Sequence, residues 1–512
     1  MQSLGLGVLL YVPSHTSELT GLLGVTLKFG AKTCILAPAT GMAQISTADT
    51  AARSASLLAR SFGTDHRQHL WTILNRRRYA GVDTLADLSW PIFLVVDSVY
   101  LCPPSGLVLN GWMADPFFQV RSLRLRSGSA VLEIRRETYI ATSRPDVVET
   151  FGQQYGFTTE DCGFIVHAPD IYTAGRDIYL EVETLSGDIA YYPVQPPKSS
   201  GLPAIKALLD SFDLRYDTLM RGYDQVIGPA VAAMNKFHME TQLRVTTLAF
   251  GEQVSAPRSS IIVPLYGRVD FMEYQLAFFS ESLAADHELI YVLDDPKLLR
   301  QAEDLAASCL ARFRRAFKLV VLSHNVGYGR ASNVGLLVAQ GADVCFLHSD
   351  VFPHQPNWLE FMIETLHGNE RVGAVGAVLL FEDGTVQHQG CVLTRRPEFG
   401  GLPVCLHPRK GRYPEDTAEI RKVPALTGAC LVMSRERAVA MGGFDAGYVI
   451  GNFEDVDLCR RLQKAGLDCV VDHRASLYHL ERQSQAAQHH RWKKNLTLYN
   501  AWLFKEKWGW HG

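Results

Sequence analysis

Short runs of consecutive apolar residues alternate with longer helical patterns from Ser259 onward, and this alternation restricts the possible folds more than any other feature. A run such as Ser260–Leu265 is mostly apolar, which is typical of a strand covered by helices on both faces. Strands and helices that alternate at this spacing predict a mostly parallel α/β sheet, in which ligands bind beyond the carboxyl ends of the strands. The other predicted strands are Glu288–Leu293, Lys318–Ser323 and Val344–Ser349, and the predicted helices are Val269–Leu283, Pro296–Ala316 and Gly329–Gln340.

The first half of the chain has a different character. Residues 1–88 combine strand-like runs, such as Val8–Val12, with a helical pattern from Thr47 to Arg78, which predicts a small α/β or helical segment. Residues 89–197 contain short β-rich runs separated by Gly and Pro, which favours a β-sandwich-like accessory domain. We expect a helical connector over residues 198–257 and the α/β domain over residues 258–512.

Composition narrows the possible partners and location. The 512 residues carry a net charge of −3, which gives no reason to expect a nucleic-acid partner. Ten cysteines without a CxxC pair indicate reduced, mostly buried thiols. The N-terminus lacks the basic region of a signal peptide, and no apolar run reaches 18 residues, so we expect a cytoplasmic protein.

Three aromatic residues and one C-terminal segment could either bind a ligand or membrane or simply pack in the core. Trp112, Tyr191 and Tyr192 are candidates for stacking on sugar rings, but their more ordinary role is in the core of the accessory domain. The basic and aromatic segment Arg491–Trp510 either makes peripheral contact with the inner face of a membrane or packs on the core as a C-terminal helix. For the three aromatic residues, packing in the core is favoured. For the segment Arg491–Trp510 it is favoured as well, because the segment has few apolar residues for a membrane-binding face.

Polar or turn-forming residues follow each of the four predicted strands of the α/β domain. Each group alone has an ordinary explanation, since Asp295 before Pro296 can simply begin a helix. Their joint occurrence suits a nucleotide sugar, whose diphosphate charge a hard cation and a cationic side chain can neutralise. The groups are Pro264, Tyr266 and Gly267; Asp294 and Asp295; Asn325 and Gly327; and His348, Ser349 and Asp350.

The α/β region resembles family-2 glycosyltransferases, which are inverting enzymes of the GT-A fold. The resemblance covers residues 259–508, and the segment from Thr427 to Ser484 is its most specific part. Among the enzymes of this family, those of bacterial surface polysaccharide assembly are the most similar. The matching blocks are SIIVPLYG (260–267), LDDP (293–296), NVGYGRASNVGL (325–336), LHSD (347–350), VGAVGAVLLFEDGTVQHQG (372–390), TGACLVMSRERAVAMGGFD (427–445), FEDVDLCRRLQKAG (453–466) and YHLERQS (478–484).

The resemblance implies a role for each matching residue. Asp350 corresponds to the last acid of a DxD-type metal motif, His479 to a histidine at the metal or diphosphate, and Asp455 to the catalytic base. The first acid of the metal motif is replaced by His348, which can still ligate a metal but removes a negative charge. Residues assigned to the nucleotide sugar are Pro264, Tyr266, Asp294, Asp295, Asn325, Gly327, Arg330, Asn333 and Ser349, and those assigned to the acceptor are Gly443, Asp445 and Glu454.

The chemistry of direct displacement supports the assignment of the base. One carboxylate must face the leaving diphosphate from the acceptor side and take the proton of the acceptor hydroxyl. Glu454, Asp455 and Asp457 begin a helical pattern, where acids can also simply favour the helix dipole. The Gly-rich stretch before Asp455 makes that residue the best candidate.

The predicted function is therefore transfer of a hexose or deoxyhexose to a hydroxyl of a glycan or lipid-linked glycan. The donor is a UDP-, dTDP- or GDP-linked sugar, and the cofactor is Mg²⁺ or Mn²⁺. Two other functions remain open. A nucleotidyltransferase shares the nucleotide-binding half of the fold, and a degenerate transferase that only binds glycan would account for His348.

Overall fold

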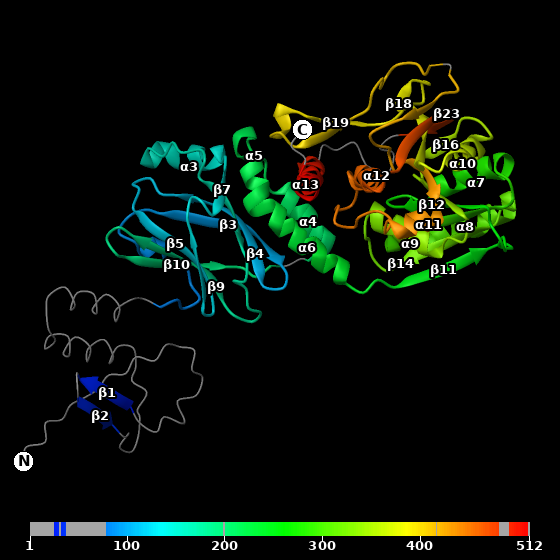
Figure 1. Cartoon of the computed structure of the whole chain (residues 1–512). Helices are drawn as coiled ribbons and strands as arrows, with labels where there is room; N and C mark the ends of the chain where they lie inside the picture. The colour runs from blue at the N-terminus through cyan, green and yellow to red at the C-terminus, as the bar shows by residue number, and fades with distance from the viewer. Residues whose placement is uncertain are drawn as a thin grey trace, which may run out of the picture. The chain divides into compact units, whose positions relative to one another are not determined.

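The computed structural model describes residues 25–29, 32–36, 78–197, 200–415, 417–480 and 491–509 (Figure 1). The chain forms two compact units, which are described separately here. The first comprises residues 1–93, 115–133 and 173–194, and the second comprises residues 94–114, 134–172 and 195–512. The strand-like run at Val8–Val12 and nearly all of the helical pattern predicted for Thr47–Arg78 lie outside the described residues.

The first unit contains antiparallel strands. A hairpin pairs β1 (Val25–Phe29) with β2 (Lys32–Leu36). A second sheet has the order β10-β9-β5-β6, with β10 at Ile189–Val194, β9 at Ile178–Thr184, β5 at Val120–Ser127 and β6 at Ala130–Ile134. Tyr191 is buried and meets the ring of Tyr179 edge-on at 5.6 Å, so it belongs to the core of this unit, whereas Tyr192 is half-buried.

The second unit begins with another four-stranded sheet, of order β3-β4-β8-β7. Its strands are β3 (Phe93–Cys102), β4 (Gly106–Ala114), β8 (Gly163–Ala168) and β7 (Tyr139–Thr142), and helix α3 (Pro145–Tyr155) follows β7. Trp112 of β4 is half-buried, with the ring of Phe151 at 5.9 Å and the guanidinium of Arg144 at 5.7 Å. Because the two four-stranded sheets belong to different units, the sandwich-like domain stays a prediction.

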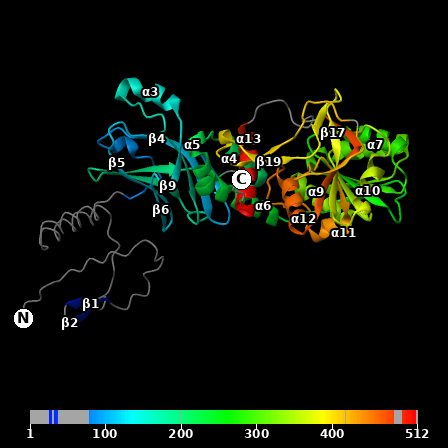
Figure 2. The same cartoon turned by 45° about the horizontal axis from the view of Figure 1, so that its top comes forward.

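Helices occupy residues 201–240, as the apolar periodicity predicts, but the expected helical connector is wrong near its end, because Val245–Phe250 pairs at the edge of a sheet as strand β11. They are α4 (Gly201–Asp210), α5 (Tyr216–Gly222), the π-helical turn η2 (Tyr223–Ile227) and α6 (Gly228–Glu240). The last helix of the chain, α13 (Arg491–Trp508), packs against α4 (Figure 2). The side chain of Asn495 in α13 donates hydrogen bonds to the carbonyls of Leu209 and Phe212 at 2.7 and 2.9 Å. Trp502 and Phe504 are buried, so the prediction that this segment packs on the core is confirmed.

A large mixed sheet forms the remainder of the second unit. Four of its neighbouring strands run parallel, in the order β14 (Phe317–Leu322), β13 (His287–Leu293), β12 (Ser259–Leu265) and β15 (Asp343–Leu347). These are the four strands that the sequence predicts. Beyond β14 the antiparallel strand β11 (Val245–Phe250) follows. Beyond β15 follow β22 (Cys430–Ser434), β17 (Val372–Leu380), β23 (Asp468–His479) and β16 (Val351–Pro353).

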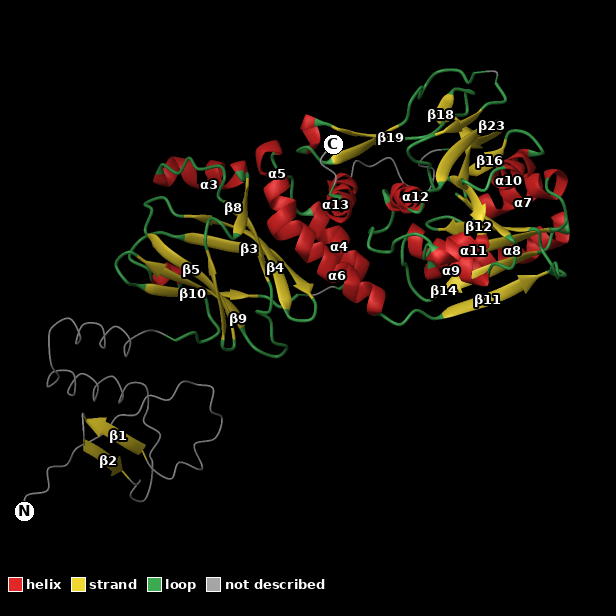
Figure 3. Cartoon of the chain, viewed as in Figure 1, coloured by secondary structure: helices red, strands yellow, loops and turns green. Residues whose placement is uncertain are grey.

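Helices cover both faces of this sheet, as its buried strands require (Figure 3). Leu289 and Tyr291 of β13 join a core with residues of α7 (Phe271–Ser282), α8 (Leu299–Phe313) and α10 (Trp358–Gly368). The alternate residues Ile290 and Val292 join a second core with residues of α9 (Tyr328–Val338) and α12 (Glu454–Lys464). The fold is therefore the α/β class that the alternating pattern predicts.

Shorter elements lie between β17 and α12. Strand β18 (Val386–His388) pairs with β17, β19 (Val392–Arg395) forms a hairpin with β20 (Pro403–Leu406), and β21 (Ile420–Lys422) pairs with β23. The helical segments between β17 and α12 are η4 (Pro397–Phe399) and α11 (Arg435–Ala440). One more short helical segment, η3 (Pro296–Leu298), directly precedes α8. Within the described ranges, none of the helices is both long enough and apolar enough to cross a membrane.

Candidate active site

The carboxyl ends of the parallel strands bring the predicted polar residues together. Strands β12 and β13 are in register from Ser259 opposite His287 to Leu265 opposite Leu293, so both end at the same edge of the sheet. The backbone N–H of Asp294 donates to the carbonyl of Leu265 at 2.9 Å, just past the last strand pair. Ligands of parallel α/β sheets bind beyond this edge.

Asp294 holds the loop after β14 in place. Its carboxylate accepts hydrogen bonds from the backbone N–H groups of Val326 and Gly327 at 2.7 and 2.9 Å, and from the side-chain amide of Asn325 at 3.2 Å. Burial raises the pKa of Asp294 to about 7, although these N–H groups act in the opposite direction. Both oxygens of Asp294 thus already have protein partners, and the carboxylate holds the loop of residues 325–327.

Residues beside Asp294 border the same edge. Asp295 accepts from the backbone N–H of Lys297 at 3.3 Å and begins η3, which is the ordinary helix-capping role for an Asp before Pro296. Pro264 in β12 is half-buried, and Tyr266 is 44% exposed. The ammonium of Lys206 lies 5.5 Å from the centre of the Tyr266 ring. Lys206 also donates a hydrogen bond to the Tyr266 hydroxyl at 3.4 Å, so these two side chains contact each other at this edge.

Arg330 lies on the first turn of α9, near the carboxylate of Asp294. Its Nη1 atom is buried and makes no hydrogen bond to any described residue. Burial lowers the pKa of Arg330, and the nearby carboxylate of Asp294 partly offsets that effect. A buried guanidinium nitrogen without a partner is costly, so this group is well placed for an anionic ligand.

The side chain of Asn333 binds the backbone of the loop that contains Gly443. The side-chain amide of Asn333 donates to the carbonyl of Phe444 at 2.7 Å, and its oxygen accepts from the N–H of Phe444 at 2.8 Å. Gly443 has a φ of +65°, and a Cβ atom there would lie 2.1 Å from Oδ1 of Asn333. Asn333 therefore positions the loop before α12, and Gly443 allows that loop to approach closely.

Three metal-ligand side chains converge beside the sheet edge. The ligand atoms of His348, Asp350 and His479 all lie within 4.8 Å of one another. Nε2 of His479 is 3.3 Å from Oδ1 of Asp350, and Nδ1 of His348 is 4.0 Å from the same oxygen. Pairing of β16 with β23 places Val351 opposite His479, which brings together residues far apart in sequence.

The surroundings of these three groups set their protonation states. Burial lowers the pKa of His348 to about 4, so its imidazole is neutral and able to ligate at neutral pH. Burial raises the pKa of Asp350, but the hydrogen bond from His479 and the two imidazoles lower it overall. Nδ1 of His479 contacts Oε1 of Gln387 at 2.5 Å, which fixes the ring and leaves Nε2 directed at Asp350. Ser349 lies between the two ligands and is half-buried.

Asp455 lies at the start of α12. Its Oδ2 accepts from the backbone N–H of Gly428 at 2.9 Å, and its Oδ1 accepts from the N–H of Val456 at 2.8 Å. Burial raises the pKa of Asp455 above its ordinary value, although these N–H groups oppose the shift. A carboxylate with a raised pKa is a stronger base, as proton removal requires.

The segment that leads into α12 is strained. Ile450, Asn452 and Phe453 all have positive φ angles, of 63°, 85° and 73°, which non-glycine residues rarely adopt. Glu454 follows them, is buried, and leaves its Oε2 without a hydrogen-bond partner among the described residues. Burial and the neighbouring charge of Asp455 raise the pKa of Glu454 well above its ordinary value. Such strain typically occurs at ligand-binding sites.

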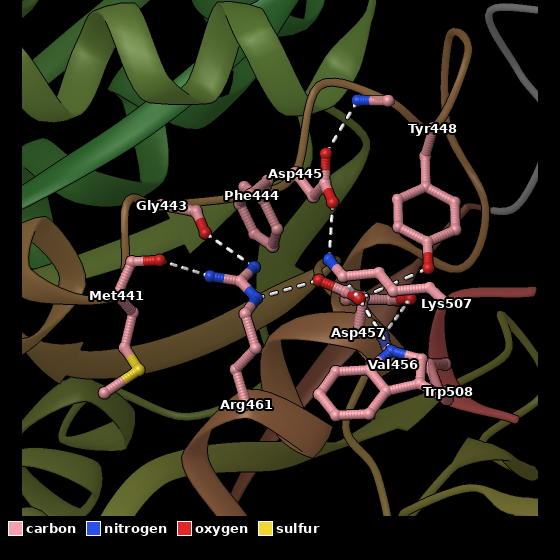
Figure 4. Close-up of polar contacts among 12 residues, drawn as sticks. Met441, Gly443, Phe444, Asp445, Tyr448, Val456, Asp457, Arg461, Lys507 and Trp508 are labelled. Carbon is pink, nitrogen blue, oxygen red and sulfur yellow. Dashed lines mark hydrogen bonds and ion pairs between the residues drawn. The ribbon is translucent and has the colours of Figure 1, made fainter. Parts of the chain in front are cut away.

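A network around Asp457 stabilises the loop before α12 (Figure 4). Asp457 is fully buried and receives hydrogen bonds or ion pairs from Arg461, Lys507 and Trp508, each at 2.8 Å. Arg461 in turn donates to the carbonyl of Gly443 at 2.8 Å. Asp445 in the same loop accepts from Lys507, and this bond lowers the pKa of Asp445 against the effect of burial. Asp457 is thus structural, as the ordinary interpretation of the helix-start acids allows.

The structure adds residues that the sequence does not single out. Tyr328 donates from its hydroxyl to the carbonyl of Gly428 at 2.7 Å, and its ring meets that of His348 edge-on at 4.8 Å. Gln387 orients His479 from a strand that is not adjacent in sequence. Both lie inside blocks of the family resemblance, but only the pairing of distant strands shows what they contact.

Comparisons with known proteins show what this chain is similar to over part of its length. A family model described as glycosyl transferase family 2 matches residues 260–437, a range that ends before Asp455 and His479. O-antigen biosynthesis protein RfbC of Myxococcus xanthus is 29% identical over 243 residues, which are 45% of this chain and 18% of that protein. An N-acetylglucosaminyl-diphospho-decaprenol L-rhamnosyltransferase of Mycobacterium tuberculosis is 28% identical over 202 residues, which are 34% of this chain and 64% of that protein. The chain thus spans less than a fifth of the first of these relatives and under two thirds of the second.

The chain is also similar in part to a solved structure, that of GalNAc-T7 with UDP, GalNAc and Mn²⁺. It has a TM-score of 0.36 and 14% identity, and the match covers 48% of each chain. The parallel strands, the polar residues at their ends and the helices on both faces define an α/β domain of the glycosyltransferase GT-A type. In particular, the chain carries a glycosyltransferase family 2 domain, which confirms the family that the sequence resembles.

Proposed function

We propose that this chain is an inverting glycosyltransferase, which moves a sugar from a nucleotide diphosphate to a hydroxyl of a glycan or glycolipid. The observation that carries the proposal is the link between base and metal cluster through one short backbone segment. Oδ2 of Asp455 accepts from the N–H of Gly428, and the carbonyl of the next residue, Ala429, accepts from the N–H of His348 at 2.9 Å. The base and the cation site are thus bonded to two adjacent residues. This arrangement fits direct displacement of the diphosphate by the acceptor hydroxyl.

The residues of the cluster fit a divalent cation. They offer two imidazoles and one carboxylate, a donor set more favourable to Mn²⁺ or another transition metal than to Mg²⁺, which prefers oxygen ligands. His348, Asp350 and His479 would hold the ion, and a bound cation would neutralise charge on the leaving diphosphate. Gln387 keeps the ring of His479 turned toward Asp350, so the protein itself fixes the ligand geometry.

The remaining predicted residues divide between donor and acceptor. Nη1 of Arg330, which has no hydrogen-bond partner among the described residues, would bind the diphosphate, while Asp294 and Asn325 shape the loop beside it. Asp455 takes the proton of the acceptor hydroxyl. Gly443 and Asp445 lie in the loop before α12 and Glu454 begins that helix, and we assign these three residues to the acceptor side.

We further infer that the acceptor belongs to a bacterial surface polysaccharide or its lipid-linked precursor. Two relatives carry names from that chemistry, an O-antigen biosynthesis protein and a rhamnosyltransferase of a lipid-linked sugar. Deoxyhexose donors are therefore the first to test. Residues 258–512 form the proposed catalytic part, with residues 89–197 as an accessory domain and residues 198–257 as the connector.

The decisive experiment measures nucleotide release from a panel of UDP-, dTDP- and GDP-sugars with Mn²⁺. Slow release of a nucleoside diphosphate from one donor is expected. Release of pyrophosphate instead would identify a nucleotidyltransferase. Stabilisation against heat by a glycan, without turnover of any donor, would identify a binding protein.

Replacing Arg330 with Ala is expected to weaken donor binding. A hydrogen bond to a charged group contributes about 1.5–3 kcal/mol, so the KM for the donor should rise about tenfold to a hundredfold with a smaller change in kcat. Steady-state kinetics on the identified donor measure this. Arg300→Ala removes an exposed arginine of α8 as a matched control, and an equal effect in both variants would argue against the role of Arg330.

The pH dependence of transfer should report the raised pKa of Asp455. Only the deprotonated carboxylate accepts a proton, so kcat/KM should fall as the pH drops through the pKa of Asp455. Since burial raises that pKa, the acid limb should lie at higher pH than for an ordinary aspartate. A pH series of initial rates with saturating metal measures it, and a limb at or below pH 4 would contradict the assignment.

A further inference from the structure

A second cluster of metal-ligand side chains lies in the segment between β17 and β21, apart from the three proposed active-site ligands. It consists of His388 at the end of β18, Cys391 just before β19, and His407 just after β20. His388 and Cys391 are 2% and 3% exposed, and His407 is half-buried. We propose that His388, Cys391 and His407, completed by Cys405, form a zinc site that fixes this segment.

The distances within the cluster match a tetrahedral ion. The Nδ1 atoms of His388 and His407 are 2.9 Å apart, and Sγ of Cys391 is 3.8 Å from each of them. With Zn–N near 2.05 Å and Zn–S near 2.3 Å, a tetrahedral site has an N···N edge of about 3.3 Å and N···S edges of about 3.6 Å. Shifts of a few tenths of an ångström therefore suffice to accommodate zinc.

The three clustered groups do not include Cys405, so for the fourth ligand the Cys405 side chain of the hairpin would turn toward them. Cys405 lies in β20, two residues before His407, which follows the end of that strand. The pairing of β19 with β20 places Cys405 opposite Leu393, next to the turn that carries Cys391. The neighbouring thiol of Cys405 and burial both raise the pKa of the Cys391 thiol. The set becomes Cys₂His₂, which is typical of closed structural zinc sites.

The protonation states also suit a metal. Burial and the neighbouring imidazoles hold the pKa of His388 well below its ordinary value, so the ring is neutral. In the metal-free arrangement its Nε2 accepts from the N–H of Gly390 at 3.2 Å. Zinc on Nδ1 would replace the contact between the two Nδ1 atoms and leave the ring proton on Nε2, so the N–H of Gly390 would turn away from that atom. Coordination by two thiolates would release two thiol protons to solvent.

The site has a structural consequence for the active centre. Gln387 precedes His388 on β18, and it orients His479. Successive residues of a strand point to opposite sides, so a zinc held by His388 would fix the strand from the side opposite Gln387. The proposal does not depend on sugar transfer, because its readouts are metal content and spectra.

The test uses the full chain carrying Asp350→Asn and His479→Ala, which removes ligands of the proposed active-site cluster. Protein purified without chelators is expected to contain about one zinc ion per chain by elemental analysis. Exchange for Co²⁺ should give a thiolate-to-cobalt charge-transfer band. The proposed active-site cluster contains no thiolate, so this band separates the two sites.

Variants assign the ligands. Cys391→Ser and His407→Gln should lose the bound zinc, and Cys405→Ser should lower the charge-transfer intensity by about half, because one of two thiolates remains. Cys162→Ser, at a half-buried cysteine of the first half of the chain, is the matched control and should keep both zinc and band. Should Cys391→Ser fail to fold, the cobalt spectrum of the parent protein still decides.

Absence of zinc together with absence of the cobalt band in folded parent protein would overturn the proposal. A Cys391–Cys405 disulfide, detected by mass spectrometry of protein kept from oxidants, would overturn it as well. An unchanged band in Cys405→Ser would remove Cys405 from the ligand set.

Discussion

Asp455→Asn is expected to lower the rate of sugar transfer by about a hundredfold to ten-thousandfold, the usual contribution of a general base. The amide keeps the shape of the side chain and one acceptor oxygen for the N–H groups of Gly428 and Val456. It cannot take the proton of the acceptor hydroxyl. Transfer rates at saturating donor and acceptor measure the effect, and donor affinity by calorimetry should change little.

The matched control for this prediction is Glu436→Gln, the same carboxylate-to-amide change at an exposed position of α11. It should leave the rate unchanged. Full turnover by Asp455→Asn would show that another group is the base. A loss of donor binding equal to the loss of rate would mean that Asp455 serves to build the site rather than to accept a proton.

Asp457→Asn is expected to cost about 3–5 kcal/mol of folding free energy, as does breaking a buried ion pair by removing one partner. Asp457 is fully buried, and its carboxylate receives Arg461, Lys507 and Trp508 (Figure 4). The amide would leave the guanidinium of Arg461, whose side chain is only 19% exposed, without its counter-charge. Denaturant unfolding followed by circular dichroism measures the loss.

A surface pair provides the control for that prediction. Asp213 and Lys494 are 3.0 Å apart, with side chains 61% and 54% exposed. Solvent screens such a pair, so Asp213→Asn should cost no more than about 1 kcal/mol. Equal effects of the two substitutions would show that the Asp457 network does not hold the loop before α12.

The sequence predicts the α/β domain well because its signals are local. Strands such as β13 are buried along their whole length, so an unbroken apolar run identifies them without knowledge of their partners. Asp295 before Pro296 likewise indicates its capping role from two adjacent residues. Helix α3 was missed in a region dominated by strand-like runs, where its short pattern gave little signal.

Contacts within the candidate site could not be predicted from local sequence patterns. The order of the blocks indicates Asp455 and His479 through family resemblance, but spacing does not reveal that Asn333 binds the backbone of Phe444. It also does not reveal that Asp294 bonds the loop of Val326 and Gly327 with its own carboxylate. These contacts join residues more than thirty positions apart, and only the packed chain specifies them.

The sequence by itself therefore determined the class of the domain, its parallel strands and the residue types at their ends, because periodicity and strand-end chemistry are written in neighbouring residues. Only the tertiary structure decided which of those residues keep atoms available for a ligand. Asp294 and Asp457 have protein partners, whereas Nη1 of Arg330 has no hydrogen-bond partner among the described residues and Asp350 lies beside two imidazoles. The physical reason is that distant segments of the chain bury each group and bond to it. These contacts set its protonation state and decide which of its atoms can still bind a ligand.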